Sequence, residues 1–170
     1  PSDSEIISRT YRVTNPAVLG KSIEQVMKTL EKTGFVLSRI KKGTDILVAS
    51  PSILLESGNE LVVVGTETAQ ARAAMLFGEP TEQHLGTEGD GIEYRRIFVS
   101  SKHAAGKPIR SLHLEKEFGA TITRVRRGDI DLVPSPDMIL ELGDRVRVVT
   151  RNENLDRVTK FFGDSIKGVS

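Results

Sequence analysis

Hydrophobic and polar residues follow the same order twice along this chain. Short apolar segments bounded by turns predict strands, and apolar residues at helical spacing predict helices with one buried face. In the first half these elements are strands at 6–13, 35–40, 45–48 and 61–64, a helix around Ile23, Val26, Met27 and Leu30, and a helix at 66–77. The second half has strands at 93–99, 120–125, 131–133 and 146–149, a helix from Pro108 to before Gly119, and a closing helix at 152–162. Each half therefore predicts the order β-α-β-β-β-α.

The repetition also holds residue by residue. Residues 34–78 align without gaps on residues 119–163, and 15 of these 45 pairs are identical. Chance does not produce such a run, so we expect two tandem copies of one small α/β (α+β) domain, at 6–78 and 93–163. Pro80 and the glycines that follow it predict an irregular linker at 79–92.

Local signals place the ends of the elements and the cores. Ser22 and Gln25 have the spacing of a capping box, and Pro108 suits a first helical position. Gly34 and Gly119 are expected to end the first helix of each copy. The short apolar runs predict the following buried core residues: Leu47, Val63, Val64, Leu132, Val148 and Val149.

Composition narrows the function mainly by exclusion. The 170 residues carry a net charge of +1, too small to indicate nucleic acid, and no cysteine for a disulfide or thiolate metal site. The three histidines lack the spacing of metal ligands, and no nucleophile or phosphate-loop motif occurs. We therefore expect neither an enzyme nor a bound cofactor. The chain lacks an initial Met and a run of about 18 apolar residues, so we expect a piece of a longer protein.

Several motifs resemble the TrkA-C domain, the C-terminal domain of regulators of potassium conductance. A Gly-Lys-(Ser/Pro)-Ile helix start occurs at 20–23 and 106–109. The second copy adds Arg-Arg-Gly at 126–128, Pro-Ser-Pro-Asp at 134–137 and Leu-x-x-Gly-Asp at 140–144. The first copy departs from this pattern at three positions, Ala49, Ser52 and Asn59. Two adjacent copies without a nucleotide-binding domain resemble the cytosolic insert of bacterial aspartate:alanine exchanger-type transporters.

This resemblance implies a regulatory, ligand-sensing module of a bacterial transporter or ion channel for cations or amino acids. It places the module on the cytoplasmic side of an inner-membrane protein, attached to that protein's transmembrane domains. The chain is expected to form a homodimer and to bind no nucleic acid. The implied ligand is a nucleotide such as cyclic di-AMP, or another small anion, held where two copies meet.

Basic residues recur at equivalent places in the two copies, and helix-start N–H groups at 22–24 and 108–110 are expected to hold an anion. The expected ligand-binding residues are Lys21, Ser22, Ile23, Arg39, Lys107, Pro108, Ile109 and Arg124. One alternative is that these basic side chains are only solvated and that Gly-Lys merely turns the chain. The module would then be a structural dimerisation domain without a ligand.

Overall fold

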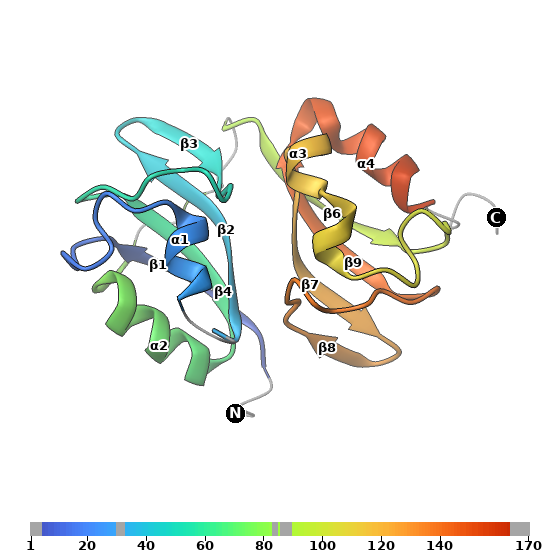
Figure 1. Ribbon diagram of the computed structural model, residues 1–170, viewed down its shortest axis with the longest axis horizontal. Helices are drawn as coiled ribbons and strands as arrows, with labels where there is room; N and C mark the ends of the chain where they lie inside the picture. The colour runs from blue at the N-terminus through green and yellow to red at the C-terminus, as the bar shows by residue number, and fades with distance from the viewer. Residues whose placement is uncertain (1–4, 30–32, 83–84, 86–89, 164–170) are drawn as a thin grey trace. The chain divides into compact units, whose positions relative to one another are not determined.

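The chain separates into two compact units, Pro1–Asp90 and Gly91–Ser170 (Figure 1). The computed structural model describes residues 5–29, 33–82, 85 and 90–163. Each unit is an antiparallel sheet with helices on one face, so the fold is mixed α/β. The order β-α-β-β-β-α that the sequence predicts is confirmed in both units. Leu30, expected on the first helix, lies outside the described residues.

The first unit builds a sheet in the order β3-β2-β4-β1-β5, and α1 and α2 lie on the same face of it (Figure 1). Its elements are β1 (Ile7–Arg12), α1 (Ile23–Lys28), β2 (Phe35–Lys42), β3 (Asp45–Val48), β4 (Glu60–Gly65), α2 (Glu67–Phe77) and β5 (Pro80–Thr81). The expected capping box is present, because the Ser22 hydroxyl accepts from the Gln25 N–H and the Gln25 side chain accepts from the Ser22 N–H. This helix start satisfies its own backbone donors.

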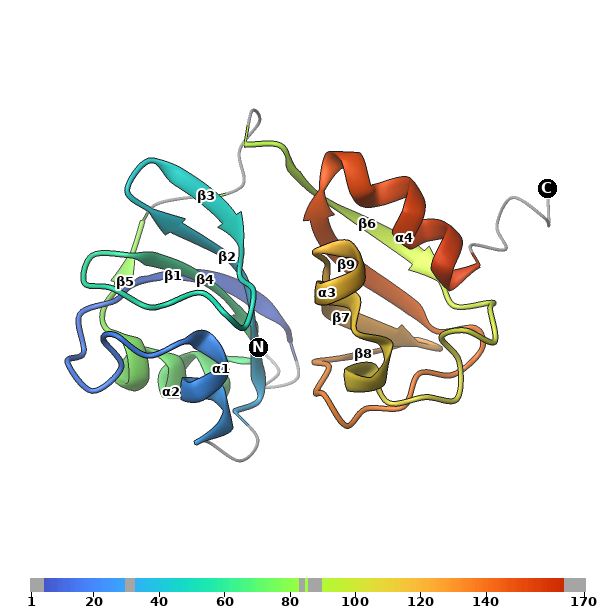
Figure 2. The same ribbon diagram turned by 45° about the horizontal axis from the view of Figure 1, so that its top comes forward.

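The second unit builds a sheet in the order β6-β9-β7-β8, with its helices on one face (Figure 2). Its elements are β6 (Ile92–Phe98), the 3-10 helix η1 (Ile109–Leu112), α3 (Leu114–Phe118), β7 (Thr121–Arg127), β8 (Ile130–Leu132), β9 (Arg145–Arg151), the 3-10 helix η2 (Asn152–Asn154) and α4 (Leu155–Phe162). Pro108 therefore precedes a 3-10 turn rather than opening an α-helix. Gly119 ends α3 in the left-handed conformation, as expected.

Each core lies between the central strands and the helices. Val63, Val64, Val148 and Val149 are buried, as the sequence predicts. Leu47 and Leu132 are only partly buried, so the prediction is wrong for these two. They lie on β3 and β8, which are edge strands with a neighbour on one side only. A short apolar run does not distinguish an edge strand from a central strand.

Two further expectations about the ends of elements are wrong. Gly34 lies directly before β2 with φ +75°, whereas α1 ends at Lys28 with Thr29 as its C-cap. The segment 79–92 is not wholly irregular, because Pro80 and Thr81 pair with β1 and Ile92 begins β6. Proline at a sheet edge needs no ladder donor on its outer side, which allows β5 to form there.

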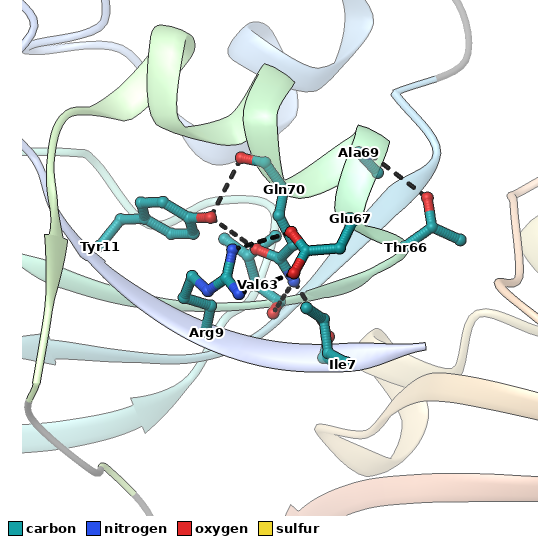
Figure 3. A network of polar contacts seen from close by, with 8 residues as sticks. All are labelled: Ile7, Arg9, Tyr11, Val63, Thr66, Glu67, Ala69 and Gln70. Atoms are coloured by element: carbon teal, nitrogen blue, oxygen red, sulfur yellow. Dashed lines mark hydrogen bonds and ion pairs between the residues drawn. The ribbon is translucent and has the colours of Figure 1, made fainter. Parts of the chain in front are cut away.

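A buried polar network links α2 to the sheet of the first unit (Figure 3). The Tyr11 hydroxyl lies 2.8 Å from the Gln70 side-chain oxygen, and burial raises the pKa of this phenol. The Gln70 amide nitrogen donates to the backbone oxygens of Ile7 and Val63, both at 3.0 Å. By alignment of the copies, the second unit places Ile97 and Leu155 at the positions of Tyr11 and Gln70. The same fold therefore accepts either a polar or an apolar pair here.

Changing Gln70 to Leu is expected to lower the free energy of unfolding of the first unit by about 2 kcal/mol, because two backbone oxygens lose their donor and the Tyr11 hydroxyl keeps only the backbone oxygen of residue 70, at 3.0 Å. The added change Tyr11→Phe is expected to cost less in Gln70→Leu than in the unmodified chain, since one of the two acceptors of the Tyr11 hydroxyl is already lost. Urea unfolding of both single variants and the double variant measures the coupling. Strictly additive losses would contradict a shared network.

Candidate functional site

The two Gly-Lys loops are held in place by the segment that joins the third and fourth strands of each unit. Ser22 forms an isolated β-bridge with Leu54, and Pro108 forms the equivalent bridge with Ile139. The backbone oxygen of Lys21 also accepts from the Leu55 N–H at 2.8 Å. Gly20 and Gly106 precede the lysines with φ +80° and +82°, a conformation that favours glycine. The motif thus turns the chain and fixes the lysine beside the neighbouring loop.

The backbone donors at these helix starts are already used within each unit. The N–H groups of Ile23 and Glu24 donate to the carbonyls of Ile53 and Pro51, both at 2.9 Å. The Ser22 N–H donates to Gln25 within the capping box. The expectation that residues 22–24 hold an anion through their N–H groups is therefore wrong.

The same holds for 108–110 in the second unit. The Ile109 N–H donates to Met138 at 2.9 Å and the Arg110 N–H to Pro136 at 3.0 Å. Pro108 has no N–H to offer. The physical reason is common to both units: the segment that carries the Ser-Pro step folds back onto the helix start and supplies its missing acceptors.

Side chains rather than backbone groups remain exposed at this loop. Lys21 and Lys107 are exposed, and Leu54 and Ile139 beside them are 53% and 52% exposed. Each unit therefore presents a cation next to an apolar side chain at the same place in the fold. The sequence reasoning missed Leu54 and Ile139. The available signal was that each precedes a buried leucine, Leu55 or Leu140, at matching positions of the two copies.

A β-bulge at the same place in both sheets decides where the other two candidates point. The register between β2 and β4 shifts between Leu37 and Arg39, and that between β7 and β9 shifts between Ile122 and Arg124. In a regular strand, residues two positions apart lie on the same face of the sheet. The extra residue at the bulge changes this, so the residue two positions after the core residue lies on the opposite face. Arg39 and Arg124 therefore lie on the sheet face away from the helices.

The structure does not gather the predicted residues of either unit into one site. Lys21, Ser22 and Ile23 lie at the helix start, whereas Arg39 lies on the other face of the first sheet. The Nε atom of Arg39 lies 3.9 Å from an Asp90 carboxylate oxygen, and burial lowers the pKa of this guanidinium despite that carboxylate. In the second unit, Lys107 and Arg124 are separated by the sheet in the same way.

The basic residues Arg127 and Lys42, at the turn after the second strand of each unit, have a structural role. This role explains why the first copy departs from the TrkA-C pattern at Asn59. Arg127 donates to both oxygens of the buried Asp144 carboxylate, from Nε at 2.9 Å and from Nη2 at 2.8 Å. Burial acts to raise the pKa of Asp144, but Arg127 and the Glu141 N–H lower it overall. In the first unit, Lys42 donates to Asn59 at 3.2 Å. Lysine and asparagine thus replace the arginine and aspartate together.

Two kinds of feature are absent from the part of the chain that the structure describes. No three histidine, aspartate or glutamate side chains gather there as a metal site would require. Among the same described residues, every helix is too short or too polar to cross a membrane.

Comparison with known proteins gives a family match for the second unit and relatives for almost the whole chain. Residues 94–163 match the model of the TrkA-C domain. An uncharacterized transporter of Geobacter sulfurreducens is 41% identical over 163 residues, covering 96% of this chain, and one of Bacteroides fragilis is 38% identical over 160 residues, covering 94%. The chain spans 30% of the length of each of these relatives.

Two solved structures are also similar. The crystal structure of the GsuK RCK domain is 12% identical, with a TM-score of 0.43, and covers 95% of this chain and 65% of that one. The RCK C domain of the potassium transport protein KtrA, in complex with cyclic di-AMP, is 25% identical with a TM-score of 0.39. That match covers 42% of this chain and 84% of the other.

Proposed function

We propose that this chain, whose residues 94–163 match the model of the TrkA-C domain, is a regulatory, ligand-sensing module of a membrane transporter. The observation that carries the proposal is the pair of relatives named as transporters, which match the chain almost end to end while it spans 30% of their length. The module itself is proposed to act by binding rather than by catalysis. Its position would be the cytoplasmic side of an inner membrane, beside transmembrane domains of the same transporter.

The same reasoning extends to the first unit, which we infer to be a second and more divergent copy of the TrkA-C domain. Apart from the additional β5, its strand order, its bulge and its bridge between the Gly-Lys loop and the next loop repeat those of the second unit. We therefore propose domains at 6–78 and 93–163 joined through 79–92. Such a tandem pair is the arrangement expected of an aspartate:alanine exchanger-type insert.

The ligand that fits the Gly-Lys loops is a small anion with an apolar part, for which a nucleotide such as cyclic di-AMP is the model. Lys21 and Lys107 would contact its phosphate groups, and Leu54 and Ile139 would contact its bases. A single loop covers little of such a ligand. We therefore propose that two loops meet around it, one from each chain of a homodimer.

Thermal unfolding with cyclic di-AMP tests this proposal. A ligand that binds only the folded state raises Tm, by about 10 °C at a hundredfold excess over Kd. Changing Lys107 to Ala is expected to weaken the binding about tenfold, because a charge-assisted hydrogen bond is lost. Lys116→Ala, which removes an exposed cation from α3, is the matched control and is expected to bind normally.

Three outcomes would contradict the proposal. If neither cyclic di-AMP, other nucleotides nor amino acids raise Tm, the module is a dimerisation domain without a ligand. If Lys107→Ala and Lys116→Ala weaken ligand binding equally, the ligand does not bind at the Gly-Lys loop. If sedimentation shows a strict monomer at ligand saturation, the ligand is not held between two chains.

A further inference from the structure

The face of the second sheet that points away from its helices carries a row of three arginines. Arg96 on β6 pairs with Arg147 on β9, and Arg147 pairs in turn with Arg124 on β7. Directly paired residues of antiparallel strands have Cα atoms about 5 Å apart, and their side chains point to the same face. Three guanidinium groups therefore lie side by side across the sheet, and we call them the arginine row.

The neighbouring row on this face does not neutralise them. It contains Phe98, Arg145, Arg126 and Asp131 in register. Both carboxylate oxygens of Asp131 accept from Arg126 at 3.1 Å, so this carboxylate is already engaged. The two rows together hold five arginines and one aspartate, a net charge of +4. Like charges placed directly opposite each other on a sheet are destabilising, so this surface favours an anionic partner.

Contacts with the Tyr94 ring orient Arg96 and Arg147 without cancelling their charge. The Arg147 guanidinium carbon lies 4.7 Å from the centroid of the Tyr94 ring, and that of Arg96 lies 5.8 Å from it. The Nε atom of Arg147 is buried and has no hydrogen-bond partner among the described residues. Burial lowers the pKa of Arg147, and the charges of Arg124 and Arg96 lower it further. The Arg147 guanidinium is thus held in place with part of its hydrogen-bonding capacity unused.

The first unit shows that the fold itself does not need these charges. At the positions of Arg96, Arg147 and Arg124, the first unit has Thr10, Val62 and Arg39. Thr10 pairs with Val62 there, and Val62 pairs with Arg39. One arginine remains where the second unit has three. A feature that is costly and dispensable for folding is best explained by binding.

We propose that the arginine row binds a small soluble anion that carries at least two phosphate groups. The planar guanidinium fork matches phosphate oxygens in pairs, and three forks in a row span about 10 Å. Arg124 and Arg147 are half-buried, so a broad surface such as a membrane reaches mainly Arg96. A small anion can enter between the side chains. This site is separate from the Gly-Lys loop, which lies on the helix side of the sheet.

Calorimetric titration of the whole 170-residue chain with inorganic pyrophosphate at about 50 mM salt tests the proposal. Two substitutions copy the first unit, Arg147→Val and Arg96→Thr, and each places a residue that this fold already accepts. Each is expected to weaken pyrophosphate binding about 10- to 100-fold. The Tm without ligand is expected to stay level or rise, because repulsion within the row is relieved. Lys160→Gln, an exposed cation on α4, is the control for net charge and is expected to bind normally.

Each of the following results would overturn the proposal. The site does not exist if pyrophosphate fails to bind the unmodified chain, or binds Arg147→Val and Arg96→Thr as tightly. Should Arg147→Val fail to fold, Arg96→Thr decides alone, because Arg96 is exposed. Binding that Lys107→Ala abolishes and Arg96→Thr preserves belongs to the Gly-Lys loop of the proposed function. Binding to phosphatidylglycerol vesicles but not to pyrophosphate makes this face a membrane contact instead.

Discussion

Replacing Val148 with Asp is expected to unfold the second unit. Val148 lies on β9, pairs with Arg95 and Ile122 on the strands to either side, and is 0% exposed. It belongs to the core that also contains Val158 and Phe162. A carboxylate there would lose its hydration without gaining a partner, at a cost of about 5 kcal/mol or more. A domain of this size has about that much stability in total, so little folded second unit should remain.

Hydrogen exchange measures this effect separately in the two units. The amides of β7 and β9 are expected to lose their protection in Val148→Asp, while those of β2 and β4 keep theirs. Ile130→Asp supplies the control, since this side chain is 60% exposed and its replacement leaves the core unchanged. A Val148→Asp protein that keeps native protection in β9 would show that the core has been placed wrongly.

The elements that the sequence predicted well are those that depend on local or repeated signals. Because the sequence is duplicated, the strands of the first unit predicted the position of every strand of the second. The Ser22 capping box could be predicted from two side chains at the right spacing. Burial of Leu47 and Leu132 was overestimated, because strand order in a sheet is decided by distant pairings. Likewise, the short strand at Pro80 depends on β1, which is some seventy positions earlier in the chain.

The candidate site was less accessible to sequence reasoning, for two reasons. Whether a helix-start N–H is available depends on the partner that folds back onto it, here Ile53 or Met138, about thirty residues away. The arginine row depends on a bulge that adds one residue before Arg124. Strict alternation from Ile122 would have turned Arg124 toward the helices and Val125 away from them. Only the register shows that Arg96, Arg147 and Arg124 are neighbours.

Replacing Asp144 with Ala is expected to lower the free energy of unfolding of the second unit by about 3 kcal/mol. The buried carboxylate accepts from Arg127 at 2.8 and 2.9 Å and from the Glu141 N–H at 2.9 Å, so its removal leaves these donors unpaired. The double variant Arg127→Lys with Asp144→Asn copies Lys42 and Asn59 of the first unit. It is expected to be more stable than Asp144→Ala in urea unfolding. A double variant no better than Asp144→Ala would show that the two units hold this turn differently.

The same carboxylate gives the second unit a defined response to acid. Its pKa in the folded protein lies below the value of about 3.9 for an unfolded aspartate. The stabilisation from Asp144 is therefore complete above about pH 4, and it is lost as the pH falls through the folded pKa. Urea unfolding between about pH 6 and pH 2 should show a smaller loss of stability in Arg127→Lys with Asp144→Asn than in the unmodified chain, because asparagine does not titrate. Identical slopes in the two proteins would mean that Asp144 titrates alike in the folded and unfolded states, and the Arg127 contact would then contribute nothing to stability in solution.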